Sequence, residues 1–202
     1  MRVAVIGFGN IGRTLARAWE RAGHQVVVGA RDPASAAAEV RSALGGTAAV
    51  HTVADALAGA DAVLLALPGA AVPGLLRDHG AALAGVVLLD AANDVGGSTL
   101  HQAEAVATLA PGAHAFRAFN TLGWENLAEP VIGGVTADLI FCGPDGAPRQ
   151  SAERLIADVG LRPVYVGGAD AADVVDGVAK LWFALALGQG RGRRLAFKVL
   201  EP

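Results

Sequence analysis

The chain has 202 residues, of which 53% are hydrophobic and 17% are charged, and its formal net charge is -3. These values are typical of one large domain or two very small ones, and they exclude a disordered chain and an extended basic surface for nucleic acid. The single cysteine, Cys142, excludes an intramolecular disulfide framework and a cysteine-based zinc site, and it predicts a protein of the reducing cytoplasm.

No segment is expected to lie in a membrane. The longest charge-free run near the middle, residues 62–76, is shorter than the roughly 20 residues of a membrane span, and prolines interrupt it. The apolar run at residues 3–6 is followed at once by glycine, so we interpret it as a buried strand and not as part of a signal peptide.

Short runs of β-branched residues alternate along the chain with alanine-rich stretches of helical character. In chain order, strands are expected at residues 3–6, 25–28, 47–50, 62–67, 86–90, 115–119, 138–142 and 164–166. Helices are expected at residues 13–22, 52–58, 72–79, 98–109, 150–159 and 171–187, and Asp32 and Pro33 open a further helix as its N-cap and first residue. This alternation predicts an α/β fold with a doubly wound, mostly parallel sheet of the Rossmann type.

Two parts of the C-terminal half have a distinct pattern. Residues 121–134 form the longest stretch without clear periodicity, so they are a candidate site loop. The last helix places six apolar residues on one face, namely Val174, Val175, Val178, Leu181, Trp182 and Leu185. Trp182 and Phe183 are candidates for a dimer or ring contact, and burial in the core is the alternative.

The first expected strand leads into the sequence Gly7-Phe8-Gly9-Asn10-Ile11-Gly12, which then opens a helix. A G-x-G-x-x-G pattern in this context is typical of dinucleotide-binding proteins. Gly7 permits the tight turn, Gly9 lets the backbone approach a pyrophosphate, and Gly12 lets the helix pack close to the strand. The free N–H groups of the first helical turn are expected to hold the phosphates.

The residues after the second strand discriminate between the two nicotinamide dinucleotides. NAD-binding sites usually have an acid there, which accepts from the ribose 2′-hydroxyl. This chain has Ala30 and Arg31, and a guanidinium at that place favours the 2′-phosphate of NADP. Asp32 is the alternative ribose ligand, although capping of the next helix also explains it, and a merely exposed Arg31 is the other alternative.

Further candidate residues follow three other strands, at the carboxyl edge of the sheet, where open α/β folds bind ligands. They are Leu67, Pro68, Ala91, Asn93, Asn120 and Thr121. Their amide and backbone groups are candidates to position a nicotinamide carboxamide, and ordinary turn chemistry is the alternative explanation.

The acid–base residues of several other enzyme classes are missing. Tyr165 is followed four residues later by Ala169, so there is no Tyr-x-x-x-Lys pair, and no G-x-S-x-G sequence occurs. The five histidines have no metal-ligand spacing, so no metal site is expected. Lys180 is a candidate proton donor for carbonyl or imine reduction, and a solvated lysine is the alternative.

The tail after the last helix is basic and rich in glycine. Its arginines are Arg191, Arg193 and Arg194. We expect them either to close over an anionic ligand or to be solvated near the helix C-terminus.

Four segments of the chain resemble the coenzyme F420-dependent NADP oxidoreductase family. They are the glycine motif at residues 7–12, Gly-Ala-Arg at residues 29–31, Phe-Arg-Ala-Phe-Asn-Thr-Leu-Gly at residues 116–123, and Leu-Ala-Phe-Lys-Val-Leu at residues 195–200. The resemblance covers nearly the whole chain. The Ala-Phe-Asn-Thr and Phe-Lys-x-Leu segments are its more specific parts.

The resemblance implies a homodimer that exchanges hydride between NADPH and a deazaflavin, coenzyme F420, or a flavin. By position, Phe8 to Ile11 would line the pyrophosphate, and Ala30 and Arg31 the 2′-phosphate. Leu67, Ala91 and Asn120 would lie near the nicotinamide. The chain departs from the family at Ala30, where serine or threonine is common, and at Asn120, where archaeal members have histidine.

We therefore expect a cytoplasmic NADP(H)-dependent oxidoreductase with no nucleic-acid or membrane partner. Residues 1–168 would form the NADP-binding domain, and residues 169–202 a helix and tail packed on that domain or on a dimer partner. Direct hydride transfer requires two rings held face to face without water more than it requires acid–base residues. The alternatives are a carbonyl or imine reductase that uses Lys180 and a non-catalytic module that senses NADP or binds a partner.

Overall fold

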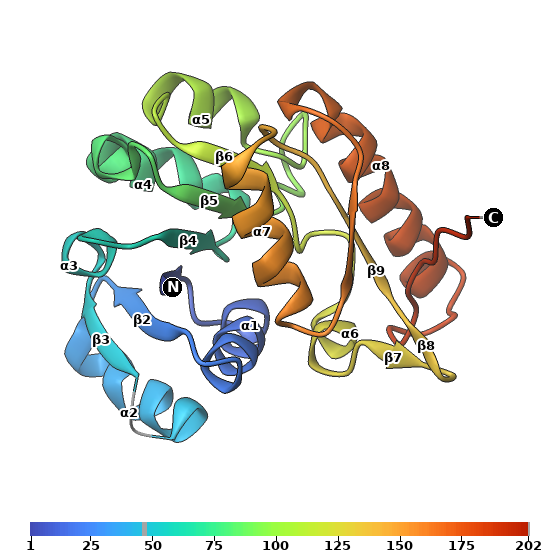
Figure 1. The fold of residues 1–202 in the computed structure, drawn as a ribbon, viewed down its shortest axis with the longest axis horizontal. Coiled ribbons are helices and arrows are strands. Elements are labelled where there is room, and N and C mark those ends of the chain that lie inside the picture. Colours follow the sequence, from blue (N-terminus) through green and yellow to red (C-terminus); the bar gives the residue numbers. More distant parts are fainter. Residues whose placement is uncertain (46–47, 202) are drawn as a thin grey trace.

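A six-stranded sheet runs through the middle of the protein, with helices on both of its faces (Figure 1). The computed structural model describes residues 1–45 and 48–201. The strands lie in the order β3-β2-β1-β4-β5-β6, and every neighbouring pair is parallel. Their bounds are β1 Arg2–Ile6, β2 Gln25–Ala30, β3 Ala49–Thr52, β4 Ala62–Leu65, β5 Val87–Asp90 and β6 His114–Arg117. This topology confirms the predicted Rossmann-type α/β fold.

The two faces of the sheet bury separate cores, because successive side chains of a strand point to opposite sides. In β1, Val3 and Val5 join one core, and Ala4 and Ile6 join the other. The first core lies under α1 (Asn10–Arg21), α2 (Pro33–Leu44) and α7 (Ala147–Ala157), and the second under α3 (Val53–Leu57), α4 (Val72–His79) and α5 (Ala103–Leu109). Short 3-10 turns flank α4, namely η1 Gly69–Ala71 before it and η2 Gly80–Leu83 after it, and a third, η3 Ala169–Ala171, precedes the last helix, α8 (Ala172–Phe183).

The C-terminal half continues the sheet beyond β6. β9 (Asp138–Phe141) and β10 (Arg162–Tyr165) are parallel to each other, and an antiparallel bridge between Arg117 and Cys142 attaches them to β6. α8 (Ala172–Phe183) packs against β9 and continues into a π-helical turn, η4 (Ala184–Gly188). In the described part of the chain, no helix has the length and apolar character that crossing a membrane requires.

The candidate site loop, residues 121–134, contains regular structure that the sequence pattern did not indicate. It holds α6 (Trp124–Ala128), which lies beside α1, and β7 (Val131–Ile132), which forms a small antiparallel hairpin with β8 (Val135–Thr136). These elements are too short to produce a helical or strand period in the sequence.

Two predicted elements have different bounds in the structure, the first because of tertiary contacts and the second because of its backbone conformation. The helix expected at residues 98–109 begins only at Ala103, because the backbone N–H groups of His101 and Gln102 donate to the buried carboxylates of Asp176 (2.8 Å) and Asp90 (3.4 Å). The strand expected at residues 115–119 ends at Arg117, because Phe119 has a positive φ of 64°. The strand expected at residues 47–50 is β3, and Thr47 lies outside the described residues, as does Pro202 at the end of the chain.

The apolar face predicted for the last helix is divided between two sides. Val175 and Trp182 are buried, whereas Val174 and Leu181 are 59% and 49% exposed. The prediction of one continuous buried face was therefore wrong. Adjacent residues of a helix point about 100° apart, so Val174 and Leu181 face solvent although their neighbours Val175 and Trp182 face the core.

Asp138, at the start of β9, fastens the C-terminal tail to the fold. Its carboxylate accepts hydrogen bonds from Arg162 (2.7 and 2.8 Å), from Lys198 Nζ (2.8 Å) and from the backbone N–H of Val199 (2.7 Å). Burial alone would raise the pKa of this carboxyl, but these donors outweigh burial and lower the pKa to about 2.

Asp138→Asn is expected to lower the free energy of unfolding by about 2 kcal/mol at pH 7, because Arg162 and Lys198 lose their buried counter-charge. A carboxyl with a lowered folded-state pKa stabilises the fold above its unfolded pKa of about 4, and this contribution disappears as the pH falls toward 2. Urea unfolding of both proteins at pH 7 and pH 3 measures the difference. Equal acid sensitivity of the wild type and the variant would contradict this account.

Candidate functional site

The loop between β1 and α1 is shaped by its three glycines. Gly7 has a φ of +99°, and a Cβ atom there would overlap the carbonyl oxygen of Ala66. A Cβ atom on Gly12 would overlap the carbonyl oxygen of Gly7, so the helix could not stay this close to the strand. A Cβ atom on Gly9, in contrast, would meet nothing within 4 Å and would point into open space beside the loop. This space fits a pyrophosphate that approaches the backbone.

The first turn of α1 keeps its backbone donors available. Gly9 is the N-cap residue, no side chain among the described residues caps this end, and the first turn contains no acid. Phe8 and Ile11 are half-buried against the core, while Asn10 is exposed and its Oδ1 accepts from Arg13 Nη2 at 2.8 Å. Free N–H groups at the positive end of a helix dipole form a site for an anion.

The end of β2 separates the roles of Arg31 and Asp32. The Asp32 carboxylate caps α2, because it accepts from the backbone N–H of Ser35 (3.2 Å) and from its hydroxyl (2.5 Å), and these hydrogen bonds lower the pKa of the carboxyl. Arg31 is exposed, and its guanidinium has no ion pair in the part of the chain that the structure describes. The two residues line a shallow pocket of about 550 Å³ together with Ser35 and Ala36. Ala30, the last residue of β2, supplies no hydroxyl to this pocket.

The loops after β4 and β5 meet at the carboxyl edge of the sheet. The backbone N–H of Gly69 donates to the carbonyl oxygen of Asn93 at 3.2 Å, which ties the segment of Leu67 and Pro68 to the segment of Ala91 and Asn93. Ala91 is buried, Leu67 and Asn93 are half-buried, and Pro68 is exposed. The structure thus brings these residues together, as their positions in the sequence predicted.

The loop after β6 presents two buried oxygen atoms to the same edge. The positive φ of Phe119, unusual for a residue other than glycine, turns the chain so that Asn120 and Thr121 follow at the end of the strand. Asn120 Nδ2 donates to the Asp176 carboxylate at 3.1 Å, which fixes the orientation of the amide. Asn120 Oδ1 and Thr121 Oγ1 are both buried without a hydrogen-bond partner in the described residues. Buried polar atoms without a partner cost stability, and a bound donor, such as a carboxamide NH₂ group, would satisfy these two.

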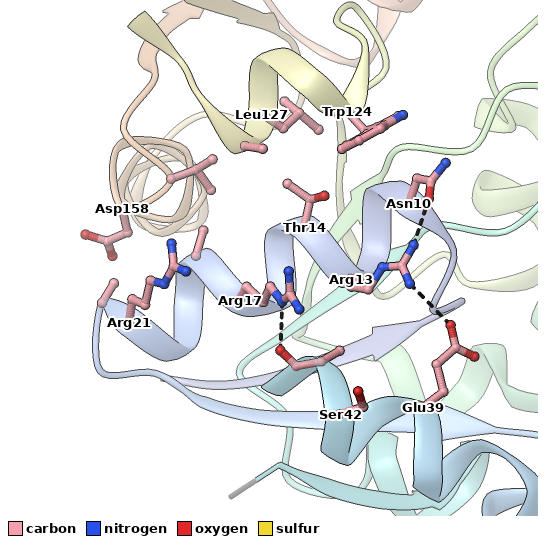
Figure 2. Close-up of a pocket in the computed structure, with 15 residues that line it drawn as sticks. Asn10, Arg13, Thr14, Arg17, Arg21, Glu39, Ser42, Trp124, Leu127 and Asp158 are labelled. Carbon is pink, nitrogen blue, oxygen red and sulfur yellow. Dashed lines mark hydrogen bonds and ion pairs between the residues drawn. The ribbon is translucent and has the colours of Figure 1, made fainter. Parts of the chain in front are cut away.

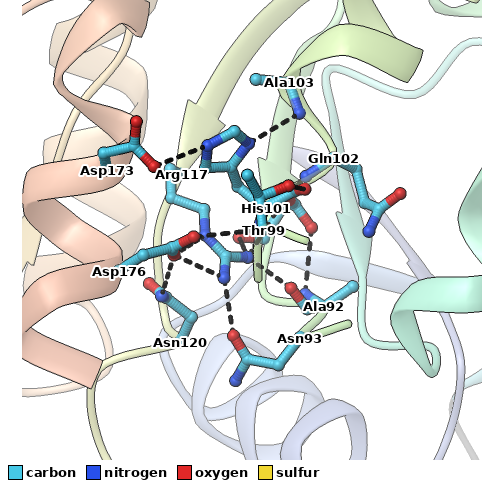
Figure 3. A network of polar contacts seen from close by, with 11 residues as sticks. Ala92, Asn93, Thr99, His101, Gln102, Ala103, Arg117, Asn120, Asp173 and Asp176 are labelled. Carbon is cyan, nitrogen blue, oxygen red and sulfur yellow. Dashed lines mark hydrogen bonds and ion pairs between the residues drawn. The ribbon is translucent and has the colours of Figure 1, made fainter. Parts of the chain in front are cut away.

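A buried ion network lies directly behind this edge (Figure 3). The Arg117 guanidinium donates to Asp176 (2.8 Å), to Asp90 (3.2 Å) and to Asn93 Oδ1 (2.6 Å), and it also contacts the carbonyl oxygen of Ala92. The side chains of Arg117, Asp90 and Asp176 are 3%, 7% and 1% exposed. Burial raises the pKa of Asp90, and the neighbouring guanidinium of Arg117 opposes this effect only in part.

Sequence reasoning named Asn93, Asn120 and the segment that contains Arg117, but it missed the network, because Asp90, Arg117 and Asp176 lie far apart in the chain. The available signals were an acid, Asp176, in an apolar helix and an arginine, Arg117, in an apolar strand. Charged residues are rarely buried unless they are paired, so two such residues in apolar elements predict a pair. The sequence does not indicate which two residues form it.

The remaining candidates lie outside the carboxyl edge. Lys180 is exposed on α8. Arg193 pairs with Glu125 at 2.5 Å, and Arg194 donates to the carbonyl oxygens of Glu125 (2.9 Å) and Glu129 (2.8 Å). These two arginines therefore hold the segment around α6, while their side chains stay 43% and 42% exposed, as the solvated alternative expected. Among residues 1–45 and 48–201, no group of three or more histidine, cysteine or acidic side chains is arranged to hold a metal ion.

The comparisons with known proteins agree with this geometry. Residues 2–94 match the model of a family described as NADP oxidoreductase, coenzyme F420-dependent. A candidate F420-dependent NADP reductase from Arthrobacter sp. FB24 is similar over 100% of both chains, with 27% identity and a TM-score of 0.85. The hypothetical protein SMa0349 from Sinorhizobium meliloti is 27% identical over 100% of this chain and 96% of its own, with a TM-score of 0.74. A reductive aminase from Aspergillus terreus shares the fold, with 23% identity over 94% of this chain and 62% of its own and a TM-score of 0.69.

The fold, the glycine loop and the family match together define the class of the protein as an NADP-dependent oxidoreductase with a Rossmann fold. Because this class is enzymatic, it does not agree with the alternative of a non-catalytic module that senses NADP or binds a partner. The resemblance to the coenzyme F420-dependent NADP oxidoreductase family is confirmed, since residues 2–94 have its sequence pattern and the whole chain has the fold of a candidate member.

Replacing Arg117, the cation of the buried network, tests how much the stability of the protein depends on this network. Arg117→Met is expected to lower the free energy of unfolding by about 3–5 kcal/mol at pH 8, because Asp90 and Asp176 remain buried without a counter-charge. The folded-state pKa of Asp90, which burial already raises, then rises further because Arg117 no longer opposes this effect, so the loss should become smaller as the pH falls toward 5. Arg117→Lys keeps the charge and should lose less. Chemical unfolding of the three proteins at pH 5 and pH 8 checks this, and a pH-independent loss for Arg117→Met would count against it.

Proposed function

We propose that the protein transfers a hydride between NADPH and a second flat redox molecule, a deazaflavin such as coenzyme F420 or a flavin. The observation that carries the proposal is the pair of buried, unpartnered oxygen atoms of Asn120 and Thr121, which lie at the edge of the sheet where the glycine loop also ends. These atoms fit the carboxamide of a nicotinamide ring. Arg31 would hold the 2′-phosphate, because Asp32 is already used as a helix cap.

NADPH, when bound, supplies the hydride from its nicotinamide ring, and the acceptor takes up a proton from water. The residues of this chain would bind, orient and exclude water. Asp176 holds the amide of Asn120 through Nδ2, so Oδ1 would remain available to accept from the ligand. Arg117 holds the loop of Ala92 and Asn93. The pyrophosphate of NADPH would contact the glycine loop, which consists of Gly7, Phe8, Gly9, Asn10, Ile11 and Gly12.

A second candidate function is the reduction of a small carbonyl or imine with Lys180 as the proton donor. Lys180 lies one helical turn after Asp176, the residue that binds Asn120, and its side chain is exposed. An exposed lysine four residues after Asp176 is the residue on which this second candidate rests.

We also propose a homodimer formed through α8 and the turn η4 that continues it. Val174, Val178, Leu181 and Leu185 follow one another at spacings of four, three and four residues, the spacing of a heptad seam, and Val174 and Leu181 are 59% and 49% exposed. Residues 169–202 would then be the part that packs both on the NADP-binding domain, residues 1–168, and on the partner. The single, buried Cys142 supports a place in the reducing cytoplasm.

Hydride exchange is tested by anaerobic stopped-flow mixing of NADPH-loaded protein with a panel of oxidised deazaflavins and flavins. The expected result is a loss of NADPH absorbance in step with bleaching of one acceptor, at the same rate in Lys180→Met. Reduction of carbonyls or imines alone, abolished in Lys180→Met, would favour the second candidate.

Arg31→Ala is expected to weaken NADPH binding about 10- to 100-fold, because one charge-assisted pair with the 2′-phosphate is lost. NADH binding should not change, because NADH lacks that phosphate. Calorimetric titration of both dinucleotides measures the two dissociation constants. Asp32→Ser, which keeps the helix cap, is the control, and the assignment fails if only Asp32→Ser affects binding.

Leu181→Glu is expected to convert the dimer into a monomer in sedimentation velocity, because a buried charge in the seam has no partner. Leu187→Glu is the matched control, since Leu187 is 56% exposed but does not belong to the seam. A wild-type monomer, or equal effects of both variants, would overturn the proposed seam.

A further inference from the structure

A groove of about 700 Å³ runs along α1, on the side that faces α2 and α6 (Figure 2). It begins near Asn10 and Trp124 and continues past Arg13 and Arg17 to Arg21. Asn10 is the one candidate contact of the dinucleotide that lines this groove, and the rest of the lining lies along α1, α2 and α6 and just after α7. Most of the groove is therefore not used by the candidate contacts of the dinucleotide.

Three arginines line the groove at intervals of four residues, so they lie on one face of α1 about 6 Å apart along the helix axis. Arg13 is 3.5 Å from Glu39, and Arg17 Nε donates to the carbonyl oxygen of Ala43 at 2.7 Å. Within the described residues, neither Arg17 nor Arg21 has a carboxylate at ion-pair distance.

Two acids, Glu39 and Asp158, line the groove beside its three arginines, and neither forms an ion pair with Arg17 or Arg21. Glu39 pairs with Arg13, and Asp158 pairs with His24 at 2.7 Å and with Arg154 at 3.6 Å. The helix dipole favours a cation in the last turn and accounts for Arg21, but it does not account for Arg17, one turn earlier. The groove therefore has an excess of positive charge, and a concave surface concentrates the field of such charges.

The upper end of the groove is continuous with the candidate site. Arg13 bonds both to Asn10, in the glycine loop, and to Glu39, across the groove. Trp124, which follows the loop of Asn120 and Thr121, is 36% exposed and lies at this same end (Figure 2). A molecule bound at the edge of the sheet can thus extend past an exposed indole ring and down the row of arginines.

We propose that this groove binds an extended anionic chain, with two or more carboxylates or phosphates, that belongs to the second redox molecule. The inference rests on the proposed function for the identity of the molecule, but the groove and its charge do not depend on it. Successive anions would pair with Arg17 and Arg21, and the part of the chain next to the ring system would pass Trp124. Guanidinium groups bind both carboxylates and phosphates through paired N–H donors.

The test uses two defined probes, tetraglutamate and tripolyphosphate, titrated calorimetrically into the full-length protein without NADPH. At least one probe should bind to the wild type, and added salt should weaken binding because the pairs are exposed. Arg17→Gln and Arg21→Gln should each weaken binding by about fivefold, the effect of losing one exposed ion pair of about 1 kcal/mol. The probe that binds more tightly distinguishes a carboxylate chain from a phosphate chain.

Arg77→Gln is the matched control, because Arg77 is an exposed arginine in the last turn of α4 and does not line the groove. Its dissociation constant should equal that of the wild type. The proposal is overturned if neither probe binds, or if Arg77→Gln weakens binding as much as Arg21→Gln. Arg21 has no hydrogen bond or ion pair with α2 among the described residues, so Arg21→Gln keeps the test valid if Arg17→Gln loosens the packing of α1 on Ala43. Probe binding without hydride exchange would leave the groove intact and refute the proposed function alone.

Discussion

The ion network around Arg117 is the interaction on which the carboxyl edge of the sheet depends. One guanidinium joins the end of β5 through Asp90, the loop after it through Asn93, and α8 through Asp176. Two carboxyl groups share one cation in a buried place, and burial raises the pKa of Asp90, so the arrangement is costly unless every donor and acceptor is paired. Removing the arginine would therefore disturb three elements at once.

The network also explains how the site can be rigid although it is built from loops. Asp176 accepts from Arg117, from Asn120 and from the backbone N–H of His101, so a single residue of α8 holds the loops after β5 and β6. The positive φ of Phe119 is maintained by burial of its ring, which packs edge-to-face on Trp19 at 5.8 Å. Strained backbone of this kind persists only where the surrounding structure fixes it, and such places are common at functional sites.

The chemistry of the edge fits a reaction that needs little acid–base catalysis. Its oxygen atoms are placed to accept hydrogen bonds, and its cations are either neutralised inside the network or exposed at Arg31. A hydride transfer between two rings depends mainly on their positions and on the exclusion of water. The groove along α1 adds a second positively charged surface, which begins at the glycine loop and is suited to a longer and more acidic molecule than the dinucleotide.

The sequence by itself determined the Rossmann order of strands and helices, the glycine loop, the cap of α2 by Asp32 and the positions of Asn93, Asn120 and Thr121. These features depend on local periodicity, on turns and on residues adjacent in the chain. Only the tertiary structure decided that Arg117, Asp90 and Asp176 form one network, that the helix expected from residue 98 begins at Ala103, and that Arg193 and Arg194 hold the loop of α6. The physical reason is that a buried charge selects its partner by position in space. Here the partners lie 27 and 59 residues apart along the chain, a distance over which no local pattern extends.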